Sequence, residues 1–149
     1  MLKDILSISG KSGLYRLTSQ ATKGIIVESL ETKKRTMIDQ HYKVSSLNDI
    51  AVYTEDDEVP LKTIFQNIHK LENGGKTSIQ PKAPAEELKA YFEKVLPTYD
   101  RDRVYVSDIK KIIKWYNLLK EFTDISFEEE QKETENQEAK SEEPAETNE

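Results

Sequence analysis

Short apolar runs, separated by glycines and polar turns, fill the first third of the chain. The segment from Ile5 to Ile38 is rich in Ile, Leu, Val, Tyr and Thr, and three glycines interrupt it. The runs are too short for helices, and their residue types suit a pleated, half-buried surface. They predict strands at residues 2–9, 14–19, 24–30 and 34–39, a helical turn at 45–49 and a strand at 50–54. Such closely spaced strands favour a meander that closes into a small SH3-like antiparallel β-barrel.

The pattern changes from strand to helix after the acidic stretch Glu55 to Glu58. Acidic residues followed by Val59-Pro60 are typical of a helix N-terminus, and Asn73-Gly74-Gly75 is typical of a helix end. Between them, apolar residues follow the spacing of one helical face, at Leu61, Ile64, Phe65, Ile68 and Leu71. The sequence therefore predicts one helix attached to the barrel.

Two further helices are predicted in the second half of the chain. Residues 74–84 contain two glycines and two prolines and read as a linker. Beyond it, one apolar face is formed by Leu88, Tyr91, Phe92, Val95 and Leu96. After Ser107, a good N-cap, a second face is formed by Ile109, Ile112, Ile113, Tyr116 and Leu119, widened by Trp115, Leu118 and Phe122. Two amphipathic helices with a short connection predict a helical hairpin.

The predicted organisation is an α+β fold followed by a charged tail. It comprises a small β-barrel plus helix at residues 1–73, a linker at 74–84, a helical hairpin at 85–122 and a disordered acidic tail at 123–149. Residues 1–122 carry 20 Lys and Arg against 17 Asp and Glu, whereas residues 123–149 carry 2 against 11. A tail of this composition contains too few apolar residues to offset its ordering entropy. It could compete for basic faces of the fold or attract a basic partner.

Composition also narrows the chemistry and the compartment. Cysteine is absent, which excludes disulfides, thiolate metal sites and a cysteine nucleophile. The N-terminus lacks the apolar core of a signal peptide, and no run approaches the roughly 20 apolar residues needed to cross a bilayer. We therefore expect a cytoplasmic protein without membrane contact.

Three short motifs resemble catalytic or metal sites but lack the rest of the pattern. Gly10-Lys11-Ser12 matches the end of a phosphate-binding loop, yet Ile5 stands where that loop needs glycine and a strand follows where it needs a helix. Asp100-Arg101-Asp102 begins like a calcium loop without the remaining ligands. The two histidines, at 41 and 69, have no second ligand at metal spacing. A hairpin turn, a solvated loop and ordinary histidines are favoured, so neither an enzyme nor a cofactor or metal is expected.

Two basic clusters offer the best candidate contact residues. The first is Lys33, Lys34 and Arg35, and the second is Lys110, Lys111 and Lys114 beside Trp115 on the third predicted helix. Lysines there could neutralise backbone phosphates, and an exposed aromatic could stack on a base. Lysine is also the ordinary residue of a solvated helix face, and Trp115 is favoured as part of the core.

Four strings of the first half resemble a known family: ILSISGKSGLYRL (Ile5 to Leu17), GIIVESL (Gly24 to Leu30), LNDIAVYT (Leu47 to Thr54) and EVPLKTIF (Glu58 to Phe65). They are similar to an uncharacterised family of small cytoplasmic proteins of the Bacteroidetes, catalogued as a domain of unknown function. RVYVSDIKKIIKWY (Arg103 to Tyr116) extends the resemblance less specifically. The resemblance implies the compartment and domain layout, and it supplies no activity, cofactor or catalytic residue.

Two functional hypotheses follow from these features. The first is a non-enzymatic protein-interaction module whose partner is unknown. The alternative is a nucleic-acid-binding accessory protein that uses the basic faces of the barrel and of the third helix. The oligomeric state is open.

Overall fold

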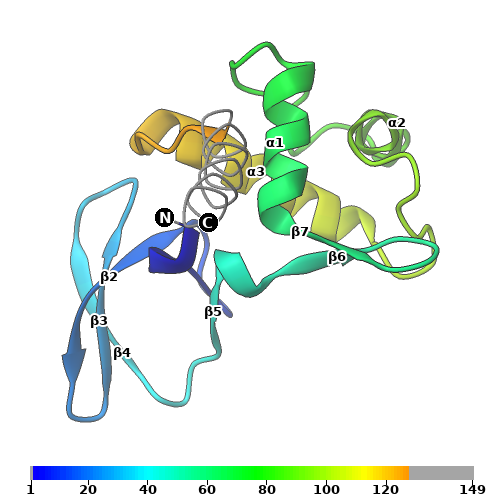
Figure 1. Cartoon of the computed structure of the whole chain (residues 1–149). Helices are drawn as coiled ribbons and strands as arrows, with labels where there is room; N and C mark the ends of the chain where they lie inside the picture. The colour runs from blue at the N-terminus through cyan, green and yellow to red at the C-terminus, as the bar shows by residue number, and fades with distance from the viewer. Residues whose placement is uncertain (1, 128–149) are drawn as a thin grey trace, which may run out of the picture.

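The computed structural model describes residues 2–127 and has an α+β fold (Figure 1). The predicted disorder of residues 128–149 lies outside this range. The elements are, in chain order, the short 3₁₀ helix η1 (Leu2–Asp4), strands β1 (Ile5–Ile8), β2 (Tyr15–Ala21), β3 (Gly24–Ser29), β4 (Arg35–Asp39) and β5 (Val44–Ser46), η2 (Leu47–Asp49), strands β6 (Ala51–Tyr53) and β7 (Glu58–Pro60), and helices α1 (Leu61–Leu71), α2 (Ala85–Val95) and α3 (Val106–Phe122).

The first five strands form an open antiparallel sheet in the order β4-β3-β2-β1-β5. Within residues 2–127, no pairing joins β4 to β5, so the structure has an open sheet where the sequence predicts a closed barrel. The sheet is nevertheless curled, because Leu6 and Ile8 of β1 share a buried cluster with Val27 of β3 and Ile38 of β4. Strands β1 and β4 are not neighbours, so only a curved sheet can bring these side chains together.

The acidic stretch before α1 forms the turn between β6 and β7. It is not the start of a helix, which corrects the prediction from the sequence. Glu58–Pro60 forms β7, which pairs with β6 as a separate two-stranded sheet. The Thr54 N–H donates to the Asp57 carbonyl at 2.7 Å, and the Asp57 N–H donates to Thr54 Oγ1 at 2.8 Å. These two bonds close the turn, and α1 begins only at Leu61, with Pro60 as its N-cap residue.

The apolar faces of the three helices are close to those predicted. Of the predicted face of α1, four residues are fully buried, whereas Leu71 at its C-terminal end is 41% exposed. Ser107 is not the cap of α3, because the helix starts one residue earlier and the Asp108 carboxylate accepts the Tyr105 N–H at 2.9 Å. None of the helices within residues 2–127 combines the length and apolar character that crossing a membrane requires.

One large core joins the sheet to all three helices. Leu14 and Leu47 from the N-terminal part lie in the same buried cluster as Ile64 of α1, Phe92 of α2 and Ile113 of α3. Helix α1 shares this core with α2 and α3, so all three predicted helices pack together with the sheet. Figure 1 shows β2, β3 and β4 extending to the side of the molecule opposite α2.

Residues 74–84 have no regular secondary structure but are hydrogen-bonded to α3. The Tyr116 hydroxyl donates to the Gly75 carbonyl at 2.8 Å, and the Thr77 N–H donates to Asn117 Oδ1 at 2.9 Å. Burial raises the pKa of Tyr116 to about 12, so its hydroxyl remains a donor at neutral pH. The predicted linker is therefore held against the third helix.

The folded body extends beyond Phe122, where the sequence places the start of the tail. Phe127 is 1% exposed, and its ring centroid lies 5.5 Å from that of Phe65 and 5.8 Å from that of Tyr116. The Thr123 hydroxyl donates to the Leu119 carbonyl at 2.6 Å, which holds the start of this segment against the last turn of α3. Residues 123–127 thus continue the folded body, with Phe127 in the core and Ile125 packed against it.

We predict that Phe127→Ala lowers the free energy of unfolding by about 3–5 kcal/mol, because it removes a fully buried ring and leaves a cavity. Chemical denaturation monitored by Trp115 fluorescence measures the loss. The control is Met37→Ala, whose side chain is 53% exposed and whose removal should change stability by less than about 0.5 kcal/mol. Equal stability of Phe127→Ala and the wild type would show that this ring is not part of the core.

Candidate binding surface along helix α3

The second basic cluster lies on α3 beside the turn that joins β1 to β2. Lys110, Lys111 and Lys114 are exposed on the helix. The Lys114 ammonium donates to Ser12 Oγ at 2.6 Å, which ties the helix to a turn 102 positions earlier in the chain. Lys111 and Lys114 face a cavity of about 370 Å³ over this turn, whereas Lys110 does not line it. The structure thus separates Lys110 from the other two.

The cavity, which we call the basic hollow, gathers a third lysine from the turn itself. Lys11 lines it and is half-buried, with its ammonium 5.4 Å from the centre of the Tyr42 ring. Gly10 and Gly13 adopt φ angles of 84° and 86°, which glycine adopts without strain. The complete lining is Ser7, Ile8, Ser9, Gly10, Lys11, Ser12, Gly13, Lys111, Lys114 and Trp115.

Lys11 is the candidate contact residue that the sequence analysis did not select. The sequence correctly assigns Gly10-Lys11-Ser12 to a turn, and on that ground it gives the lysine no role. What brings Lys11 to Lys111 and Lys114 is the packing of α3 against this turn. The sequence feature that came nearest to indicating such a role is the position of Lys11 between Gly10 and Gly13.

The first basic cluster lies farther along α3 and is dispersed. Lys33 has a φ angle of 64° and places its ammonium 5.9 Å from the centre of the Phe122 ring. Arg35 Nε lies 3.3 Å from Glu28 Oε1 across the β3–β4 pair, and Lys34 is exposed. At 1.5 Å per residue, Phe122 is about 16 Å along the helix from Lys111. Both predicted clusters therefore border α3, but they do not form one site.

A second, more apolar cavity lies on the other side of Trp115. This groove has a volume of about 280 Å³ and runs between β6 and α3. Tyr53, at its edge, is 45% exposed, and Trp115 is half-buried rather than fully in the core. Lys111 and Trp115 line both cavities. The groove is lined by Ile50, Ala51, Val52, Tyr53, Arg103, Val104, Asp108, Lys111, Ile112 and Trp115.

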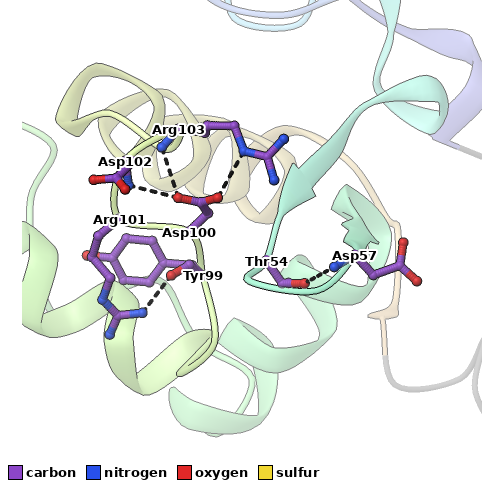
Figure 2. A network of polar contacts seen from close by, with 7 residues as sticks. All are labelled: Thr54, Asp57, Tyr99, Asp100, Arg101, Asp102 and Arg103. Atoms are coloured by element: carbon purple, nitrogen blue, oxygen red, sulfur yellow. Dashed lines mark hydrogen bonds and ion pairs between the residues drawn. The ribbon is translucent and has the colours of Figure 1, made fainter.

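One end of the groove is formed by the loop between α2 and α3, whose centre is Asp100 (Figure 2). Its carboxylate accepts the N–H groups of Asp102 at 2.9 Å and Arg103 at 3.2 Å, and the Arg103 Nε at 2.9 Å. The hydrogen bond from the Arg103 side chain lowers the pKa of Asp100 most, and the two backbone N–H groups lower it further. The Arg103 guanidinium lies 4.2 Å from the centre of the Tyr53 ring. The network therefore fixes a cation and an aromatic ring at the groove.

In Asp100-Arg101-Asp102, the motif that begins like a calcium loop, the Asp100 carboxylate and the Arg101 guanidinium form hydrogen bonds within the protein. The Arg101 guanidinium donates to the Tyr99 carbonyl at 2.6 Å and lies 2.9 Å from Glu93 Oε2. Among residues 2–127, no group of three or more His, Asp and Glu side chains is arranged to hold a metal ion.

Comparisons with known proteins match almost the whole described body. Residues 2–47 match the model "Domain of unknown function (DUF5606)", and residues 50–119 match "Domain of unknown function (DUF6852)". The solution NMR structure of a structural-genomics target from Bacteroides vulgatus is 53% identical, with a TM-score of 0.72, and the match covers 85% of this chain and 91% of that one. No curated protein matches the chain.

We predict that Asp100→Asn lowers the melting temperature at neutral pH and that the difference from the wild type disappears in acid. A carboxylate whose folded pKa is lowered stabilises the fold above its unfolded pKa, and this stabilisation is lost as the pH falls through the folded value. Thermal melts between pH 7 and pH 2 measure the effect. The control, Asp102→Asn, alters a neighbouring exposed carboxylate and should follow the wild-type pH profile. A constant deficit at every pH would contradict the assignment.

Proposed function

The chain belongs to an uncharacterised family of the Bacteroidetes matched by the DUF5606 and DUF6852 models, and within this family we propose that it is a non-enzymatic protein-interaction module. The observation that carries the proposal is the groove between β6 and α3. It combines an unpaired strand edge with an apolar floor, and these are the two features that bind a short extended segment of another protein.

The strand edge is available because β6 has one sheet neighbour. Strand β7 pairs along one side, through Ala51 with Pro60, Val52 with Val59 and Tyr53 with Glu58. Within residues 2–127 no strand adds to the other side, although the Asp100 N–H donates to the Tyr53 carbonyl at 3.0 Å and closes that end. Ile50 is already paired, since its N–H donates to the Leu47 carbonyl and its carbonyl accepts the Leu61 N–H, so a partner segment can pair beside Ala51 and no farther.

The side chains around the groove suit binding rather than catalysis. Ile112 and Val104 supply apolar surface, Tyr53 and Trp115 supply aromatic surface, and Arg103 adds a fixed cation. Tyrosine, tryptophan and arginine are the residue types most enriched in the energetic centres of protein interfaces. The volume of about 280 Å³ lies just below the roughly 300–1,000 Å³ of small-molecule sites, which favours one or two side chains of a partner.

Peptides selected from a random library against the full chain test this proposal. We expect selected peptides to shift the NMR signals of Ala51 and Val52 and to lose about tenfold or more in affinity with Tyr53→Ala, as for an aromatic anchor. Tyr42→Ala is the matched control, since Tyr42 is 42% exposed and lies outside the groove. Peptides that bind Tyr53→Ala as tightly as the wild type would exclude the groove as the binding surface.

Nucleic-acid binding is a second candidate function, favoured by the position of both basic clusters beside α3. Lys33 and Lys34 near the end of α3 and Lys111 and Lys114 near the β1–β2 turn could contact separate phosphates of one strand. Residues 2–127 carry 20 Lys and Arg against 18 Asp and Glu, so any attraction would depend on this local arrangement. The acidic residues beyond 127 would compete with the phosphates for the same lysines.

Fluorescence anisotropy with labelled single-stranded DNA and RNA tests the second function. If it holds, replacing Lys33, Lys34, Lys111 and Lys114 together by Gln abolishes binding, and the wild-type affinity falls steeply between 50 and 200 mM salt, as counterion release requires. The control replaces Lys62, Lys70, Lys89 and Lys94, which lie on other helices. Absence of binding at low salt would remove this candidate.

A further inference from the structure

We propose that the basic hollow is a binding site for a phosphate monoester. The site lies beside the groove of the proposed function, with which it shares Lys111 and Trp115. Its floor is the turn from Gly10 to Gly13, and its wall is the face of α3 that carries Lys111 and Lys114.

The charge of the hollow is unbalanced. Three of the ten lining residues, Lys11, Lys111 and Lys114, are cationic and none is acidic. None of the three forms an ion pair with a residue in the range 2–127. A carboxylate does lie beside the turn, since an added Cβ at Gly13 would be 2.8 Å from Glu31 Oε1, but Glu31 is outside the lining. A dianion would offset most of this positive charge.

Hydrogen-bond donors accompany the charge. Ser12 Oγ accepts from the Lys114 ammonium, so its own O–H is left to donate. The backbone N–H groups of Gly10, Ser12 and Gly13 make no hydrogen bond with any residue between 2 and 127. Unpaired N–H groups of a glycine turn form a concavity that binds anions. Gly10 also leaves open space, since an added Cβ would meet no atom within 4 Å.

The combination selects the monoester over the diester of a nucleic-acid backbone. A monoester carries close to two negative charges at neutral pH and three exposed oxygens, which three lysines and several N–H groups can share. A nucleic-acid strand would need a continuous basic track, whereas Lys33 places its ammonium 5.9 Å from the centre of the Phe122 ring, about 16 Å along α3 from Lys111. The hollow is a single concave site beside one turn.

Titration of the full ¹⁵N-labelled chain with inorganic phosphate, at constant ionic strength set by chloride, tests the site. We expect saturable shifts at the amides of Gly10, Ser12 and Gly13. Lys111→Gln and Lys114→Gln should each weaken binding about tenfold, as loss of one charge-assisted hydrogen bond implies. Lys110→Gln is the matched control, because it removes the same charge from the same helix outside the hollow and should leave the affinity within about twofold.

Two further measurements decide between a site and general attraction. Lys114→Arg keeps the charge and should restore binding if the ammonium acts as a phosphate contact. Titrations with O-phosphoserine and with adenosine monophosphate distinguish a phosphorylated side chain from a nucleotide as the source, and binding of either supports the proposal. Equal weakening by Lys110→Gln, or shifts that are no larger with phosphate than with chloride, would overturn it.

Discussion

The buried stripe of α3 is the constraint on which the rest of the structure depends. Ile113 and Tyr116 are fully buried, and the surfaces that bury them come from the N-terminal sheet, α1, α2 and the chain end at Phe127. Each of these units has too little apolar surface to be stable alone, because a short sheet or a single helix buries only part of its apolar face. Their shared contact with one helix is what makes the body cooperative.

This arrangement also explains where the candidate sites lie. A helix that is covered on one face must leave its polar face at the boundary of the elements that cover it. On α3 that boundary carries Lys111, Lys114 and Trp115, with the β1–β2 turn on one side and β6 on the other. The two cavities are therefore consequences of packing a sheet and a separate strand pair against the same helix.

Sequence periodicity predicted the local elements well and the long-range arrangement poorly. The faces of α1, α2 and α3 follow from 3.6-residue spacing, which needs only neighbours in the chain. Closure of the sheet depends on whether β4 meets β5, and the register and pairing partners of such short strands are not encoded by alternation. Phe127 was missed because one aromatic residue in an acidic segment gives no periodic signal, although its ring completes the cluster with Phe65 and Tyr116. Likewise, Lys11 and Lys114 are 103 positions apart, and only the docked helix brings them together.

Because Lys111 and Trp115 form part of the wall of both cavities, occupancy of one changes the surface presented to the other. A ligand that neutralises the Lys111 ammonium would alter the preference of the groove for acidic or neutral partner segments. Thermodynamic reciprocity then requires the partner to change the affinity of the hollow by the same factor. Two shared side chains would thus couple the two proposed ligands without any rearrangement of the backbone.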